Sequence, residues 1–316
     1  MTQKHPVLSR RAAIGLGAAF WLQRPLAALA ESPSFDLSPD QAARAKTAPN
    51  PAAIAAIPAG YPFVTAGKLT IGTNPGGPPL STYASDTTTI VGADPDIGAL
   101  IAQALGLEPV IVPVAWADWP LALQSGKIDV VLSNVGVTEE RKKKFDFATY
   151  RQGLHGFFVH RDSPVQKIAV PEDIAGLTIV VGIGTNQERI LGRWNEIITA
   201  AGHEPAELVY YDDEGAKLLA LRAGRVDVMV QPHAQLVAIA KRDGDFRKVG
   251  TLSAGWPERS DVAATLRKDS GLAAPVAIAL NGLIADGSYG RTLSRWLVGD
   301  EALATSEVNP PGLPEN

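Results

Sequence analysis

Short apolar runs rich in β-branched residues recur along the chain from residue 68 onward, and amphipathic stretches separate them. Residues 69–73, 109–114 and 128–132 each have the length and composition of a buried strand. Between the first two, residues 97–105 have apolar positions at helical spacing and end before Gly106, a residue that often terminates helices. The alternation of strands with helices predicts an α/β unit whose strands pair in parallel.

The same alternation continues after a junction near residue 150. Residues 153–160, 178–183 and 226–230 are predicted strands, and residues 261–266 form a further one. The length of 316 residues is somewhat long for one core and suits two domains of common size. The pattern therefore favours two α/β lobes.

The stretch from residue 123 to 150 places a candidate binding residue at the end of a strand. A helix ending at Gly126 precedes the predicted strand, and small or polar side chains follow at residues 133–138. Arg141 then lies in a new helical turn beyond the carboxyl end of the strand, where open α/β sheets bind ligands. A guanidinium suits a carboxylate, because it donates two parallel charge-assisted hydrogen bonds. The alternative is that Arg141 and the three lysines after it form a solvated basic face.

The N-terminus has the features of a signal peptide. Arg10 and Arg11 precede a mostly apolar run over residues 12–22, and residues 28–30 read Ala-Leu-Ala. These features predict a twin-arginine-like signal peptide over residues 1–30, whose cleavage would release the protein into a bacterial periplasm. The alternative is a retained N-terminal anchor, which the polar residues after the short apolar run disfavour.

Two further segments are predicted to flank the lobes. Residues 31–66 are rich in alanine and proline, and we expect an extension or linker outside the fold, with one helix over 39–46 capped by Ser38. Residues 301–316 contain three prolines and are predicted to be a C-terminal tail.

Composition excludes several kinds of function. A net charge of −4 and a pI of about 5.8 argue against a nucleic-acid partner. The chain has no cysteine, which excludes disulfides, thiol catalysis and cysteine metal sites. The five histidines are scattered without metal-ligand spacing, so no metal or other cofactor is predicted. The sequence has no nucleophile elbow, HExxH motif or P-loop.

A series of motifs in a fixed order resembles the landmarks of the polar amino-acid binding proteins of ABC transporters, the bacterial extracellular solute-binding proteins of family 3. The motifs lie at residues 68–73, 78–79, 92–97, 122–129, 138–143, 146–147, 184–188, 223–227 and 285–289. The resemblance covers about residues 66–300. Several landmarks in the right order are much more specific than any one of them.

The resemblance implies a two-lobed α/β fold, the type II periplasmic binding protein fold. Each lobe would have a mainly parallel sheet with flanking helices, and two crossover hinge strands would join the lobes. The first lobe would comprise residues 68–152 and 259–300, and the second residues 153–258. Closure of the hinge would trap a ligand between the lobes.

The resemblance also implies a set of ligand-binding residues. Arg141 would clamp the α-carboxylate of the ligand. Thr185 and Asn186 match a Gly-Thr element of the second lobe, where a helix N-terminus and a hydroxyl complete the carboxylate site. The remaining matched positions are Ser133 and Asn134, which follow the strand before Arg141, and Trp116, which would pack on the ligand side chain.

The sequence departs from the family pattern at the position that normally binds the α-ammonium of the ligand. The family usually has an aspartate there, and this chain has Pro232, which has neither a charge nor a side-chain acceptor. The neighbours Gln231 and His233 supply no fixed negative charge at neutral pH. We therefore expect a ligand that either lacks a free α-ammonium or carries its cation elsewhere. The alternative is that another acid, Asp94 or Asp118, replaces the missing aspartate.

Two further departures change the walls of the predicted site. Gly136 stands where a threonine or serine usually lends a hydroxyl to the carboxylate. Asn74 and Gly77 belong to a loop of small neutral residues that replaces the usual acidic and aromatic groups. Both changes favour a larger or N-modified carboxylate over a standard amino acid.

The predicted function is therefore the capture of an amino acid or amino-acid-like carboxylate in the periplasm for an ABC transporter permease of the inner membrane. We expect a monomer without enzymatic activity. One alternative is an enzyme like the periplasmic cyclohexadienyl dehydratases, which resemble the same family, but Pro232 occupies the position that could hold their general acid. Another is a ligand-sensor module, which the predicted tail disfavours.

Overall fold

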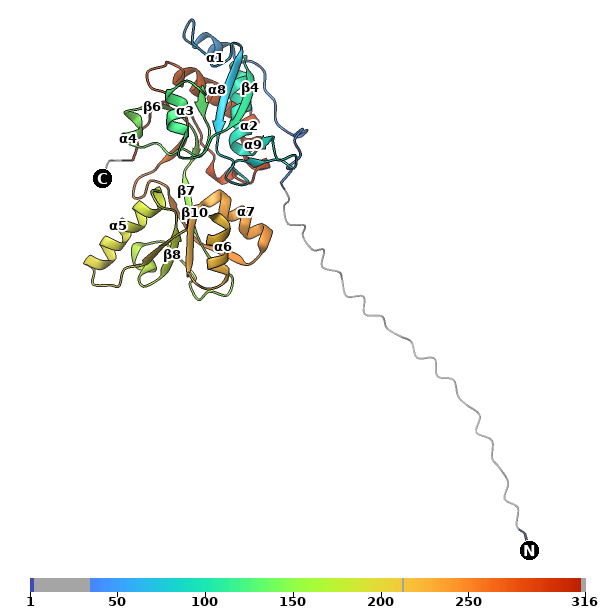
Figure 1. The fold of residues 1–316 in the computed structure, drawn as a ribbon, viewed down its shortest axis with the longest axis vertical. Helices are drawn as coiled ribbons and strands as arrows, with labels where there is room; N and C mark the ends of the chain where they lie inside the picture. Colours follow the sequence, from blue (N-terminus) through green and yellow to red (C-terminus); the bar gives the residue numbers. More distant parts are fainter. Residues whose placement is uncertain (3–34, 212, 314–316) are drawn as a thin grey trace. The chain divides into compact units, whose positions relative to one another are not determined.

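The computed structural model describes residues 1–2, 35–211 and 213–313 (Figure 1). Except for its first two residues, the predicted signal peptide over residues 1–30 lies outside the described part, as does the alternative of a retained anchor. In the part described, no helix is both long and apolar enough to cross a membrane. From residue 35 on, two five-stranded sheets organise the chain.

The first sheet has the strand order β4-β1-β5-β12-β6. β1 pairs in parallel with β4 and β5, because helical crossovers bring the chain back to the same end of the sheet. β12 enters antiparallel between β5 and β6. The strands span Lys68–Thr73 (β1), Glu108–Pro113 (β4), Val130–Val131 (β5), Phe145–Gln152 (β6) and Asp261–Arg267 (β12).

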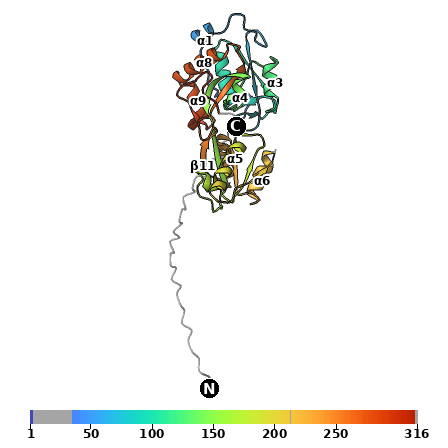
Figure 2. The ribbon, with the colours of Figure 1, turned by 90° about the vertical axis from the view of Figure 1, so that its left-hand side faces the viewer.

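Helices cover the first sheet, and a small hairpin adjoins it. In both views α1, α3, α4, α8 and α9 surround this sheet (Figure 1, Figure 2). The helices span Pro51–Ala55 (α1), Ala93–Ala104 (α2), Trp119–Gln124 (α3), Glu139–Lys142 (α4), Ala273–Ala285 (α8) and Ser288–Arg295 (α9), and the hairpin comprises Thr82–Tyr83 (β2) and Ile90–Val91 (β3). α2 is buried along almost its whole length, because it packs against β1, β4 and both late helices.

The second sheet repeats the arrangement with the order β11-β7-β10-β8-β9. β8 pairs in parallel with β9 and β10, whereas β7 is antiparallel to β10 and β11. The strands span Leu154–His160 (β7), Thr178–Val181 (β8), Glu207–Tyr210 (β9), Val228–Pro232 (β10) and Phe246–Ser253 (β11). The accompanying helices span Asn186–Ala200 (α5), Glu214–Arg222 (α6) and His233–Asp243 (α7), with 3-10 turns at Pro171–Ile174 (η1) and, after α9, Gly299–Glu301 (η2).

The predicted α/β fold class is thus confirmed, but the sheets are mixed rather than mainly parallel, since each has two parallel and two antiparallel strand pairs. Two chain crossings connect the sheets, from β6 into β7 and from β11 into β12. They touch at Gly153, whose N–H donates to the carbonyl of Ser260 at 2.9 Å. An added Cβ at Gly153 would lie 2.9 Å from that carbonyl and 3.0 Å from the Cβ of Ala254, so a glycine is needed for this close approach.

The segment before β1 packs on the first lobe, so the expectation that residues 31–66 lie outside the fold is wrong for residues 35–66. Phe35 stacks on Trp296 with a centroid distance of 5.6 Å, and the N–H of Asn50 donates to the carbonyl of Ala104 at 2.8 Å. The predicted helix over 39–46 is also absent, and the only helix described before β1 is α1, capped by Asn50. Contacts with the first lobe therefore override the local helix signal.

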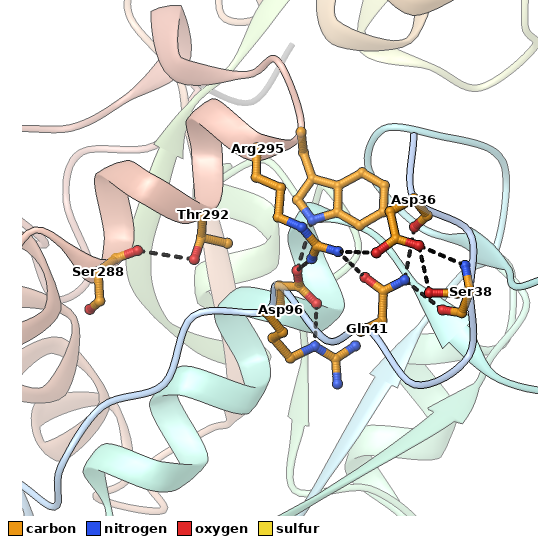
Figure 3. Close-up of polar contacts among 9 residues, drawn as sticks. Asp36, Ser38, Gln41, Asp96, Ser288, Thr292 and Arg295 are labelled. Carbon is orange, nitrogen blue, oxygen red and sulfur yellow. Dashed lines mark hydrogen bonds and ion pairs between the residues drawn. The ribbon is translucent and has the colours of Figure 1, made fainter. Parts of the chain in front are cut away.

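The carboxylate of Asp96, in α2, anchors this docked segment (Figure 3). Its side chain is 1% exposed and forms ion pairs with Arg44 at 2.6 Å and Arg295 at 2.7 Å. The indole N–H of Trp296 donates to the same carboxylate at 2.8 Å. Arg295 also contacts Asp36 and Gln41 of the N-terminal segment. One buried carboxylate therefore connects α2, α9 and the residues before α1.

The predicted C-terminal tail also packs on the first lobe as far as residue 313. Glu301 is buried and pairs with Arg151, and Leu313 is buried beside α4. The carbonyl of Leu313 accepts from the N–H of Glu139 at 2.8 Å, and the side chain of Glu139 accepts from the N–H of Gly312 at 2.7 Å. The tail thus fixes the short helix that contains Arg141.

Substitution of Asp96 tests this network. Asp96→Ala leaves two arginines and an indole N–H without their buried acceptor, and we expect the free energy of unfolding to fall by about 3–5 kcal/mol. Denaturant unfolding measures the loss. Asp118→Ala is the matched control, because Asp118 is exposed and makes no capping hydrogen bond. Equal stability of the two variants would contradict a structural role for the network.

Candidate functional site

A cavity of about 400 Å³ lies where strands of both sheets end. It is reached by residues that follow β1, β5, β8 and β10, and parallel strands gather their ligand-binding loops at this end of a sheet. Every candidate residue from the sequence lines it: Asn74, Gly77, Trp116, Ser133, Asn134, Gly136, Arg141, Thr185, Asn186, Gln231 and Pro232. The first seven come from the first lobe and the last four from the second.

Ser133 and Asn134 join the loops of the first lobe. The hydroxyl of Ser133 accepts from the backbone N–H of Asn74 at 2.9 Å, which ties the ends of β5 and β1 together. Asn134 has a left-handed backbone with φ of 54°, and its side-chain oxygen accepts from Arg151 at 2.7 Å. The side-chain oxygen of Asn134 is therefore already bonded within the protein.

Arg141 turns toward the cavity and away from the basic residues after it. Thr138 caps the amino end of α4, and a guanidinium N–H of Arg141 donates to the carbonyl of Gly136 at 2.8 Å. Lys143 and Lys144 are exposed, whereas Arg141 is half-buried. Burial lowers the pKa of the Arg141 guanidinium from its usual value, but a guanidinium stays charged at neutral pH. The geometry thus favours a binding role over a solvated basic face.

Trp116 and Trp119 form an aromatic wall beside Arg141. Trp116 is 42% exposed and lines the cavity, and its ring lies 6.3 Å from that of the buried Trp119. The guanidinium carbon of Arg141 lies 5.7 Å and 6.0 Å from the two ring centroids. Such cation–π contacts hold the guanidinium in place while leaving N–H groups for a ligand.

The second lobe contributes the N-terminus of α5. Thr185 caps this helix: its hydroxyl accepts from the N–H of Glu188 at 3.2 Å and donates to the carbonyl of Gly182 at 2.7 Å. The hydroxyl proton is therefore used within the loop, contrary to the expectation that it completes a carboxylate site. Asn186 and Gln187, the first helical residues, line the cavity, where the helix dipole favours negative charge.

Pro232, which stands where the family usually has an aspartate, lies opposite a histidine. Pro232 ends β10 directly opposite His155 of β7, so the two side chains lie on the same face of the sheet. His155 is buried, lines the cavity, and has no partner for either ring nitrogen among residues 35–211 and 213–313. Burial lowers the pKa of His155 to about 4, against the charge of Glu301, which raises it. The imidazole is therefore neutral at pH 7.

Of the two acids that could replace the aspartate, one is already held by groups of the protein and the other lies outside the lining. Asp94 is the only carboxylate that the structure describes in the cavity lining, and it is 1% exposed. It accepts from the hydroxyl of Tyr150 at 2.9 Å and the N–H of Asn134 at 3.1 Å, and lies 3.7 Å from Arg151. Burial raises the pKa of the Asp94 carboxyl, although Arg151 and Tyr150 favour its charged form. Asp118 is not among the lining residues.

Several lining residues were not predicted from the sequence. They include Ser81, His155, Lys217, Gln235 and Ser260. The position of His155 follows from strand alternation once the register of β7 and β10 is known, but the sequence alone does not reveal that register. Ser260 follows from the contact between the two crossings at Gly153, for which no local signal exists.

Comparison with known proteins assigns the family. Residues 69–299 match the model of the bacterial extracellular solute-binding proteins, family 3. The chain belongs to this family. The resemblance inferred from the motifs is therefore confirmed, and the general role of the chain is that of a solute-binding protein.

Individual relatives of this solute-binding protein cover most of its length. It is 30% identical to the L-cystine-binding protein TcyJ of Escherichia coli over 74% of this chain and 84% of that protein. It is 28% identical to the arginine-binding protein ArgT of Corynebacterium glutamicum, over 77% and 78% of the two chains. An ancestral arginine-binding protein bound to arginine has a TM-score of 0.61 and 28% identity, covering 73% of this chain and 98% of its own.

The pH dependence of stability tests the neutral state of His155. An unfolded histidine has a pKa near 6.5, so below that pH the unfolded chain binds a proton that the folded protein does not. The stabilisation is complete above pH ~6.5 and is lost as the pH falls toward the folded pKa of about 4. The wild type should lose about 3 kcal/mol more than His155→Gln between pH 7 and pH 4. Denaturant unfolding at both pH values measures this, and the exposed His203→Gln is the control. Parallel pH profiles for wild type and His155→Gln would refute it.

Proposed function

We propose that this protein is the substrate-binding component of an ABC importer and captures an amino acid or amino-acid-like carboxylate between its lobes. The observation that carries the proposal is the charged guanidinium of Arg141, held at the cavity by Trp116, Trp119 and the carbonyl of Gly136. The relatives named for cystine and arginine binding support an amino-acid-like ligand.

Binding combines three elements of the cavity. Arg141 and the N-terminus of α5 bind the anionic group, the first from one lobe and the second from the other. Trp116 covers the apolar part of the ligand. Closure of the lobes excludes water, which strengthens each polar contact because the local dielectric constant falls. The proposed cycle is monomeric, takes place in the periplasm after export by the twin-arginine-like signal peptide, and ends at an inner-membrane permease.

The expected ligand class follows from the lack, in the described lining, of a free carboxylate that could bind an ammonium group. A buried ammonium needs a charged partner, and leaving it without one costs several kcal/mol. Pro232 supplies no acceptor, and the carboxylate of Asp94 is held by Tyr150, Asn134 and Arg151. His155, opposite Pro232, is neutral and can accept or donate one hydrogen bond. A carboxylate whose nitrogen is acylated or otherwise uncharged fits this lining better than a free amino acid.

An enzymatic function has one supporting observation. The chain has a TM-score of 0.61 and 26% identity to an ancestral amino acid-binding protein described as a precursor of cyclohexadienyl dehydratase, covering 73% of this chain and 95% of that one. A dehydratase needs a general acid within hydrogen-bond reach of the substrate. Asp94 already accepts hydrogen bonds from two groups of the protein, and this favours capture without chemistry.

Arginine substitution tests the anion site. Arg141→Ala should weaken binding by about 100-fold or more, because a buried charge-assisted contact is lost, while the melting temperature of the free protein changes little. Arg141→Lys should recover part of the affinity but lose the bidentate geometry. Calorimetric titration of the mature, refolded protein measures affinity for L-arginine, L-cystine, L-glutamine and their N-acetyl derivatives. Lys144→Ala is the exposed control. Unchanged affinity in Arg141→Ala would overturn the assignment.

Matched ligand pairs test the missing ammonium site. Each N-acetyl amino acid should stabilise the wild type against heat, by roughly 2.7 kcal/mol relative to the ligand-free protein at a hundredfold excess over its dissociation constant, and its free parent at the same concentration should stabilise it less. Pro232→Asp should reverse this preference, since it restores a carboxylate at a helix N-cap position that accepts aspartate well. Stronger stabilisation of the wild type by the free amino acids would show that the ammonium has another acceptor.

A further inference from the structure

Gly136 is a glycine that the fold does not require. Its φ is not in the left-handed region, so the backbone there suits any residue. A Cβ built on Gly136 would have its nearest contact at 3.5 Å, which is an ordinary van der Waals distance. Neither strain nor crowding therefore explains the glycine. Its effect is to leave space in the wall of the cavity.

Three polar groups surround that space. The Cβ position at Gly136 lies 3.5 Å from the hydroxyl oxygen of Ser260, 3.6 Å from the side-chain amide nitrogen of Asn186 and 4.0 Å from a guanidinium nitrogen of Arg141. All three groups can donate hydrogen bonds, and they come from a chain crossing, from α5 and from α4. Donors that converge from separate elements on one small space form a site for an anionic oxygen.

Ser260 provides independent support for a ligand at this point. The residue is 2% exposed, and its hydroxyl has no hydrogen-bond partner in the described part of the chain. A buried hydroxyl without a partner is costly to the fold. Its backbone is fixed, since the carbonyl accepts from Gly153 and the N–H donates to the side chain of Ser253. The Ser260 hydroxyl is thus held at the cavity wall, where it can donate a hydrogen bond to a ligand.

We propose that an acid oxygen of the ligand occupies the space over Gly136 and accepts a hydrogen bond from the hydroxyl of Ser260. Ser260 is then a specificity-determining residue that replaces the hydroxyl absent at Gly136, from the other side of the space. The acid group is seated deeper than a side chain at position 136 would permit. Because Ser260 lies in the crossing that contacts Gly153, the same hydrogen bond couples the ligand to the junction of the lobes. This inference rests on the proposed function.

Two substitutions test the proposal by titration with L-arginine, L-cystine, L-glutamine and their N-acetyl derivatives. Ser260→Ala should weaken binding by about tenfold or more, as for loss of a hydrogen bond to a charged group. The free variant should keep or slightly raise its melting temperature, because a hydroxyl without a partner is removed. Gly136→Ala should leave the melting temperature of the free protein unchanged but weaken binding at least as much, because its methyl group fills the space.

The control is Ser306→Ala. The hydroxyl of Ser306 is likewise buried without a partner in the part of the chain described, but it does not line the cavity. This variant should bind as the wild type does. Wild-type affinity in both Ser260→Ala and Gly136→Ala would overturn the proposal, as would a drop in the melting temperature of free Ser260→Ala without a change in affinity.

A crystal structure with acetate tests the Ser260 site independently of the proposed function. If no amino acid or derivative binds the wild type, the proposed function fails, and crystals grown in sodium acetate still test the site. An acetate oxygen within hydrogen-bond distance of the Ser260 hydroxyl supports the proposal. A Ser260 hydroxyl that donates to the protein, with no anion over Gly136, overturns it.

Discussion

The guanidinium of Arg151 is buried where the two lobes meet, and several parts of the chain depend on it. It contacts Asp94 at the start of α2, Asn134 after β5, and Glu301 beyond α9. Burial alone would lower the pKa of Arg151, but the charges of Glu301 and Asp94 raise it above its usual value. A buried ion without its partners costs several kcal/mol, so these segments have to assemble together.

That assembly also determines the chemistry of the cavity. Asp94 lies in the cavity lining, but its carboxylate is held by Arg151, Tyr150 and the N–H of Asn134. The one carboxylate described in the lining thus makes its contacts with groups of the protein, and these contacts stabilise the fold. Across the junction, Glu301 lies 3.7 Å from the ring of His233 in the second lobe, so the groups around Arg151 reach from one lobe to the other. The charged groups that join the two lobes are therefore also the groups that hold Asp94 in the cavity wall.

The remaining polar groups of the cavity are mostly donors or neutral. Arg141 and the α5 N-terminus favour an anion, and His155 is neutral opposite Pro232. Gly136 adds space where a side chain would be tolerated. In the proposed function, Pro232 and Gly136 therefore act in the same direction: Pro232 offers no acceptor to a cation, and Gly136 leaves more space for an anion.

Local sequence patterns predicted seven of the strands, the family and the loops that line the cavity, but they did not predict β6, β9 or β11. These properties follow from local patterns: β-branched runs, glycines after helices, and motifs such as Thr138 to Arg141, whose capping and charge are encoded within one turn. Three features emerge only from the folded chain: residues 35–66 and 301–313 pack on the first lobe, Asp94 is held by groups of the protein, and His155 and Ser260 reach the cavity. Each of these depends on contacts between residues far apart in the chain, such as Asp96 with Arg295 or Gly153 with Ser260. A local pattern cannot specify such contacts, because they arise when separately folded surfaces meet and their buried charges and hydrogen-bonding groups find partners.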